Sequence, residues 1–230
     1  RTLSGLLSVD AMLWRVFLSL RASRAVFGAS GGFVLGVTGF VYQTVFRNPL
    51  ASPDIIGASS GASVGAAFGI LFLPGAVAVT LSAFAGAICC VLLALTLSSL
   101  TAEKDGKSIV LSGIAVHSLA QTALVCLKLL ADPEKQLASI EYWIMGSLAG
   151  VTASKIPFPV VIILFSSAVI FLLHRHVLAL SVQEDEARML GVSVQKTRFF
   201  VLFLATLTVA AAVSVTGLIS FIGLLAPHTA

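Results

Sequence analysis

Leu180–Arg198 reads LSVQEDEARMLGVSVQKTR and forms a polar segment between two long apolar stretches of the chain. This polar segment holds six of the 24 charged residues, namely Glu184, Asp185, Glu186, Arg188, Lys196 and Arg198. At the centre of a bilayer each charge would cost ~2.5–3.5 kcal/mol, or about 15–20 kcal/mol for the set. The polar segment is therefore expected to lie in water at one face of a membrane.

The polar segment has the pattern of two helices joined by a turn. Glu184–Leu190 is rich in good helix formers, Gly191 suits the position after a helix C-terminus, and Val192–Arg198 can restart a helix. Apolar side chains stand among the charges, at Met189, Leu190, Val192 and Val194. Exposed apolar residues on such a surface indicate a docking site for another protein. An ordinary loop between two spans is the alternative, and the pattern leaves both open.

Composition sets the fold class. Hydrophobic residues make up 58% of the chain and charged residues 10%, whereas a soluble domain has about 25% charged residues. We therefore predict an all-α polytopic membrane protein. The net charge of +4 comes from loops and forms no continuous basic face, so a nucleic-acid partner is not expected. The start of the chain, RTLSGLLSVD, lacks the pattern of a signal peptide, and none is expected.

Six apolar stretches have the length needed to cross a bilayer as helices. They are predicted at about Ala25–Phe46, Ile55–Leu73, Ala76–Leu100, Ile109–Ala131, Ile156–Leu173 and Phe199–Leu225. The last of them is expected to break near Gly217 into a span and a short second helix. Residues 1–24 are mixed and amphipathic, which predicts an outer segment along the membrane interface.

Small residues recur at helical spacing in the second stretch. Gly57, Gly61, Gly65 and Gly69 are each four residues apart, with Ser59 and Ser60 beside them. Gly28, Gly32 and Gly36 form a second row. Such rows let two helix backbones approach closely within a membrane. Tight helix packing is one reading, and lining a translocation path is the other.

Motifs for an enzyme or a metal site are weak. Asp105–Ser108 reads DGKS and resembles the end of a phosphate-binding loop, but residue 101 is threonine where that motif has glycine. The four histidines are scattered, with no carboxylate or cysteine at ligand spacing, so no metal site is predicted. His117 lies within the fourth stretch, where an ionisable side chain is a functional candidate or makes a helix-packing hydrogen bond.

The run RNPLASP at Arg47–Pro53, followed by IGASSGA at Ile56–Ala62, resembles the RNPLA-x-P and LG-x-s-x-GA signature of FecCD-type permeases. These are the membrane subunits of bacterial ATP-binding-cassette (ABC) importers for iron–siderophores, haem and cobalamin. Further runs agree in order and spacing: LSGIA at 111–115, YWIMGSLAG at 142–150 and GLISFIGLLAPH at 217–228. The polar segment resembles the family's cytoplasmic coupling segment through Ala187, Leu190, Gly191 and Val192. Two residues depart from the family's pattern: Gln183 stands where the family usually has Gly, and Leu218, in the run at 217–228, stands where it often has Pro.

The resemblance implies a roughly ten-helix permease fold, of which this chain is expected to be a fragment, with residues 1–230 one transmembrane domain and 180–198 its cytoplasmic coupling helices. Coupling to a cytoplasmic ATP-binding subunit is implied for Glu184, Glu186, Ala187, Arg188, Leu190, Gly191 and Val192. Arg21 and Arg24 lie in RASR, which resembles the family's R-L-P-R and implies docking of an extracytoplasmic substrate-binding protein. On the residues alone, two arginines three positions apart before a span are more often interfacial anchors.

The resulting prediction is a homodimeric permease subunit of the bacterial inner membrane that passes an iron–siderophore, haem or cobalamin between two subunits. The chain itself is predicted to be no enzyme and to hold no cofactor, because ATP is bound by the separate subunit. An ion-coupled secondary transporter is the alternative. It would be expected to carry acidic residues inside its spans, and none of the six stretches contains Asp or Glu. A membrane-embedded enzyme is a third option.

Overall fold

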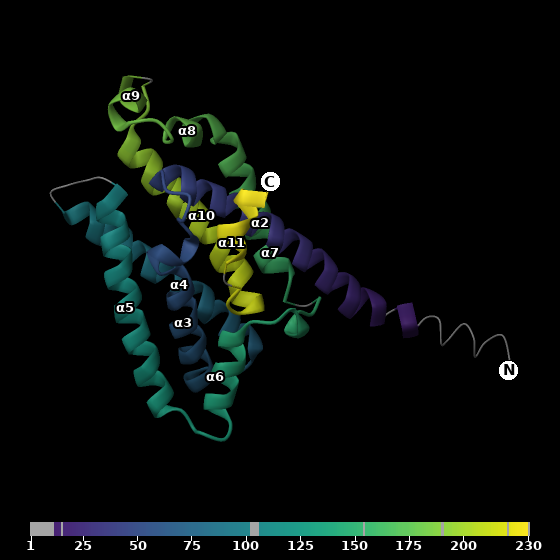
Figure 1. Cartoon of the computed structure of the whole chain (residues 1–230). Helices are drawn as coiled ribbons and strands as arrows, with labels where there is room; N and C mark the ends of the chain where they lie inside the picture. The colour runs from purple at the N-terminus through teal and green to yellow at the C-terminus, as the bar shows by residue number, and fades with distance from the viewer. Residues whose placement is uncertain are drawn as a thin grey trace.

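A computed structural model describes residues 12–14, 16–101, 106–153, 155–189, 191–219 and 221–229 (Figure 1). Within these ranges every regular element is helical. Helices suit an apolar chain in lipid because each backbone group finds its hydrogen-bond partner within its own segment. The predicted all-α membrane fold is confirmed.

The elements follow one another along the chain with short connections between them. The first part contains the π-helical run η1 (Phe17–Ala22), α2 (Ser23–Phe46), η2 (Pro53–Ile56), α3 (Ala58–Phe72), α4 (Ala76–Leu100) and α5 (Gly106–Leu130). The second part contains α6 (Gln136–Met145), η3 (Leu148–Gly150), α7 (Pro157–Leu172), α8 (His174–Ala179), α9 (Glu184–Met189), α10 (Val194–Thr216) and α11 (Ile222–Thr229). Figure 1 shows α8 and α9 at one end of the bundle and the α5–α6 connection at the other.

Four helices in the described part of the chain are long and apolar enough to cross a membrane, at 12–46, 76–100, 108–130 and 194–216. The helices of the other two predicted stretches are shorter. The helix α3 has 15 residues and α7 has 16, which is about 22–24 Å against the ~30 Å of a hydrocarbon core. All six stretches thus contain an apolar helix, but two of these helices are shorter than the hydrocarbon core is thick.

The predicted span at Ile55–Leu73 begins too early, for a local reason. Pro53 starts the short helix η2, and Gly57 then adopts a left-handed conformation with φ +85°, which ends one helix before α3 begins. Gly57 lies beside the backbone of His117, halfway along α5. The loop from Arg47 to Gly57 therefore enters the bundle and packs beside α5 in the space above the start of the short helix α3.

The helix α10 is the centre of the bundle. In its most apolar window 78% of the residues are buried, compared with 22–39% in the other three long helices. Small side chains at Ala205, Ala210 and Ala211 let neighbouring helices approach it closely. A buried polar contact also joins it to α2, because the Tyr42 hydroxyl lies 2.7 Å from Thr206 Oγ1.

The predicted break near Gly217 is confirmed. The Gly217 amide donates to the Val213 carbonyl at 2.8 Å, and its φ of +72° turns the chain out of α10. The Ser147 amide, beyond α6, donates to the Thr216 carbonyl at 2.6 Å and so satisfies the end of the helix. The chain then returns as α11, whose Gly223 packs directly on Gly39 of α2.

The described part of the predicted interfacial segment is helical and continuous with α2. Residues 12–14 and 16–22 are helical and lead into α2 without a turn, so they extend the first span in its own direction. Met12, Leu13, Trp14, Phe17 and Leu18 are exposed there. Residues 1–11 and 15 lie outside the described residues.

Candidate functional site

The polar segment forms an exposed corner at the end of the bundle where α8 and α9 lie (Figure 1). The second predicted helix is the first turn of α10, so the segment connects directly to the central span. Asp185, Glu186 and Arg188 are exposed on α9, and the Met189 side chain is 87% exposed. An accessible thioether among charges is the kind of surface that another protein can cover.

Gly191 ends α9 in a Schellman motif. Its φ is +77°, its amide donates to the Arg188 carbonyl at 2.9 Å, and the Val192 amide donates to the Ala187 carbonyl at 3.2 Å. The sequence correctly predicts a glycine turn at this position. Leu190, one of the predicted coupling residues, lies outside the described residues.

The remaining coupling candidates divide into outward and inward side chains. Glu186 and Arg188 face solvent, whereas Ala187 is buried in the same apolar cluster as Val177, Leu180 and Val194. Val192 is half-buried. Ala187 therefore attaches α9 to the bundle, and Glu186 and Arg188 remain accessible to a partner.

Glu184 also points inward. Its Oε1 accepts a hydrogen bond from Arg198 Nη2 at 2.5 Å, and its Oε2 lies 4.0 Å from Arg188 Nη2. The Arg198 side chain is only 4% exposed, so the polar segment does not lie wholly in water as its charges suggest. Sequence reasoning missed this ion pair because two charges 14 residues apart show no helical spacing.

The two candidate arginines of the docking motif behave differently. Arg24, in the first turn of α2, donates from Nη2 to the Ala149 carbonyl of η3 at 2.6 Å. Arg21 is exposed on η1. Arg24 therefore fixes the η3 loop against the start of α2, while Arg21 presents its charge to the surroundings.

The glycine row of α3 lies against α4. A Cβ at Gly61 would lie 2.5 Å from the Gly86 carbonyl oxygen, and one at Gly65 would lie 2.8 Å from the Ser82 carbonyl carbon. Ser60 Oγ donates to the Gly57 carbonyl at 3.1 Å and is buried. At these positions the small residues make a close backbone contact between two helices.

Sequence reasoning missed Asp54 of η2, a half-buried acidic residue. The Ser59 hydroxyl donates to its carboxylate. A small cleft beside Asp54 is lined by Leu35 of α2, Val213 of α10 and Leu224 of α11. Asp54 immediately precedes the predicted span. The loop before α3 therefore carries an acidic residue into the bundle.

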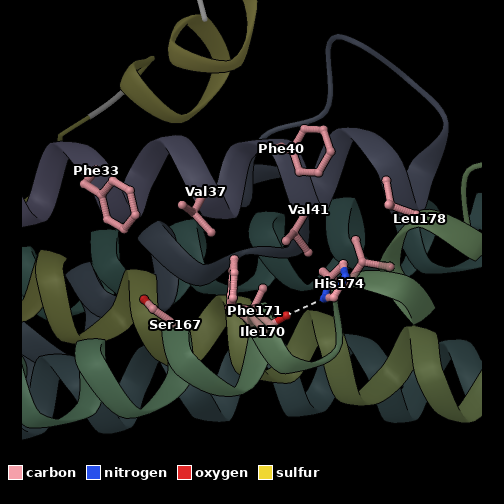
Figure 2. Close-up of a pocket in the computed structure, with 10 residues that line it drawn as sticks. Phe33, Val37, Phe40, Val41, Ser167, Ile170, Phe171, His174 and Leu178 are labelled. Carbon is pink, nitrogen blue, oxygen red and sulfur yellow. Dashed lines mark hydrogen bonds between the residues drawn. The ribbon is translucent and has the colours of Figure 1, made fainter.

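Larger cavities also flank the bundle. An apolar groove of about 360 Å³ lies between α2 and α7–α8, lined by Phe33, Val37, Phe40, Ile170 and Phe171 (Figure 2). His174 borders this groove and donates from Nδ1 to the Phe171 carbonyl at 2.8 Å. A more polar cavity of about 200 Å³ lies at the opposite end of the bundle, where Tyr142, Trp143, Lys155 and Thr216 surround the Gly217 break.

Comparison with known families identifies this arrangement. A family model described as the FecCD transport family matches residues 1–230, the whole chain. The chain belongs to the FecCD transport family. It is a multi-pass inner-membrane protein with the helical spans already described.

FecCD relatives include permeases with different cargo in their names. The cobalamin import system permease protein BtuC of Halobacterium salinarum is 35% identical over 212 residues, covering 91% of this chain and 57% of that protein. The hemin transport system permease protein HmuU of Yersinia pestis is 33% identical over 234 residues, covering 99% of this chain and 69% of that protein.

The same fold is present in a solved structure described as an inward-facing conformation of a metal-chelate type ABC transporter. The TM-score is 0.89 at 30% identity, covering 96% of this chain and 70% of that one. The chain therefore spans between 57% and 70% of the length of these proteins.

Proposed function

We propose that this chain is part of the permease subunit of an ABC importer, which passes a metal chelate such as a ferric siderophore, haem or cobalamin across the cytoplasmic membrane. The match of the FecCD family model to the whole chain carries this proposal. The exposed, glycine-capped helix α9 at one end of the bundle supports it, since it offers a docking surface to a cytoplasmic ATP-binding subunit.

The chelate is proposed to pass between two copies of the subunit. Long apolar side chains are exposed along α5, including Leu111, Ile114, Leu119 and Val125. Such a face suits lipid or the face of a second permease subunit. ATP hydrolysis is assigned to the separate subunit, so this chain does no covalent chemistry in the proposed cycle.

Uptake by the full-length permease in liposomes tests the function. The permease is assembled with its ATP-binding subunit and binding protein, and the probes are ferric enterobactin, haemin and cyanocobalamin. Uptake of at least one probe is expected only with ATP and Mg²⁺ on the side of α9. Uptake that follows an ion gradient without ATP would instead favour the ion-coupled secondary transporter.

Arg21 and Arg24 are proposed to face the substrate-binding protein. Exposed charge pairs are worth about 0–1 kcal/mol each and act mainly on the rate of encounter. We expect Arg21→Ala to slow binding-protein capture by roughly two- to fivefold at low salt, and to weaken the dependence of that rate on salt. Association rates with the complex in liposomes, measured at low and high salt, check this.

Arg24→Ala serves as the comparison, because Arg24 also fixes the η3 loop. We expect it to slow capture at both salt concentrations, since loss of the bond to Ala149 changes local structure as well as charge. If Arg21→Ala captures the binding protein at the wild-type rate at every salt concentration, Arg21 is a lipid anchor and the docking role is wrong.

A further inference from the structure

Arg198 is a buried cation at the end of the bundle where the polar segment lies. It is the fifth residue of α10 and only 3% of the residue is exposed. A guanidinium cannot lose its proton in a protein, so burial requires a counter-charge that stays in place. The neighbouring cation Lys196 is exposed, as is usual for a charge on the first turn of a helix.

Glu184 supplies that counter-charge from α9. The 2.5 Å contact between Glu184 Oε1 and Arg198 Nη2 is a charge-assisted hydrogen bond within a partly dry site, since the Glu184 side chain is 22% exposed. The second cation at Glu184 is weaker, because Arg188 stands 4.0 Å away and is 61% exposed. The link from α9 to α10 therefore depends on Arg198.

Arg198 also borders the corner between α4 and α5. A cavity of about 120 Å³ beside it is lined by Leu95 and Ser98 of α4 and by Ile109 of α5. Ser98 Oγ donates to Ser108 Oγ at 3.2 Å and so joins the ends of these two helices. Arg198 Nε is buried there, and the described residues offer it no hydrogen-bond partner.

The helix α9 has few other attachments. It is six residues long, too short to be stable by itself, and Ala187 is its buried residue. The connections before and after it are the turns at Ser181–Gln183 and Gly191–Ser193. Among the described residues, its orientation relative to the spans depends on the Ala187 contact, on the Glu184–Arg198 pair and on the hydrogen bond from Arg47 Nη1 to the Val182 carbonyl at 3.4 Å, just before α9.

We propose that the Glu184–Arg198 ion pair is a positioning element that transmits movement of α9 to α10 and to the α4–α5 corner. This rests on the proposed function, in which an ATP-binding subunit moves the exposed face of α9. Without the pair, α9 would move relative to the bundle and ATP would be hydrolysed with little transport. Glu184 then acts through Arg198 inside the permease, while Glu186 and Arg188 face the partner.

The test measures ATP hydrolysed per chelate imported by the full-length complex in liposomes. We expect Glu184→Gln to raise this ratio by about tenfold, because it removes the counter-charge and leaves a buried cation unpaired. The double variant Glu184→Arg/Arg198→Glu restores a pair with its charges exchanged, and its ratio should return to within about threefold of wild type. Lys196→Gln is the matched control for loss of a nearby exposed charge, and its ratio should stay within about twofold of wild type.

The exchanged pair also separates coupling from a local effect on α9. Glu184 is the first residue of α9, where a negative charge favours the helix dipole. The exchanged pair puts a positive charge there, so its recovery would show that the pair and not the dipole matters. A wild-type ratio in Glu184→Gln, or an exchanged pair that does no better than Glu184→Gln, overturns the proposal. If Glu184→Gln does not assemble, the exchanged pair must still assemble and couple.

A second measurement does not depend on transport. Met189 is replaced by cysteine and labelled with a nitroxide in the full-length permease, whose other cysteines, Cys89, Cys90 and Cys126 among them, are changed to serine, and the mobility of the label is recorded in the purified protein. Glu184→Gln should mobilise the label and the exchanged pair should immobilise it again; an unchanged spectrum overturns the positioning role. If wild type imports no probe although the label behaves as expected, the proposed function fails and the positioning role of the pair stands.

Discussion

Replacing Gly65 with leucine is expected to destabilise the full-length protein by about 3 kcal/mol, because α3 and α4 would have to separate. A Cβ at Gly65 would stand 2.8 Å from the Ser82 carbonyl carbon and 3.0 Å from Ala83 Cα, so even its first atom meets backbone. Backbone atoms cannot rotate away as a side chain can. The apparent melting temperature in detergent should fall by roughly 6–12 °C.

The matched control is Ala85→Leu. Ala85 is exposed on α4, the same helix that Gly65 contacts, and its neighbour Gly86 packs on Gly61. Extra atoms there enter open surroundings, and the effect should stay within about 0.5 kcal/mol. Equal losses in the two variants would mean that the α3–α4 contact is not set by the glycine row, and the packing role would be wrong.

The spans could be predicted because lipid imposes a simple rule on sequence. Any long apolar helix must begin and end near charges, turns or glycine, and α4 has the predicted limits at Ala76 and Leu100. The break at Gly217 and the turn at Gly191 were also predictable, since glycine between apolar runs is the usual residue at positive φ. These features are local, and local patterns are visible in a sequence.

The remaining features depend on contacts between distant residues. Gly28, Gly32 and Gly36 have the same spacing as the α3 row, yet an added Cβ at Gly32 would meet nothing within 4 Å. The short α3 follows from a loop that packs beside His117, which no periodicity shows. The buried Arg198 follows from a partner 14 residues earlier in the chain. Spacing therefore indicates which residues can pack closely, and only the fold decides which of them do.

Glycine has two different roles in this protein, and each predicts a different response to substitution. Gly65 is needed because another backbone occupies the space of a side chain. Gly191 is needed because of its own backbone: φ is +77° while an added Cβ would meet nothing within 4 Å. A substitution at Gly191 should thus be judged by how well the new residue tolerates a left-handed conformation, not by its size.

Replacing Gly191 with valine is expected to lower ATP-driven chelate uptake by about tenfold or more while membrane insertion stays normal. Left-handed backbone costs an L-residue ~1–2 kcal/mol, and β-branched residues adopt it least readily. The Schellman bonds to Ala187 and Arg188 would be lost, so α9 would leave α10 at a different angle. The buried spans are unaffected because Gly191 is exposed. Uptake per assembled complex in liposomes, together with the amount of protein in the membrane fraction, measures both parts of the prediction.

Gly191→Asn is the discriminating control. Asparagine occurs in the left-handed conformation far more readily than valine and is the second choice after glycine at this helix position. Open space around Gly191 accommodates its side chain. We therefore expect the asparagine variant to keep at least about half of the wild-type uptake. Equal loss in both variants would mean that the glycine is needed for close contact with a partner, and normal uptake in the valine variant would mean that the shape of this turn does not matter for coupling.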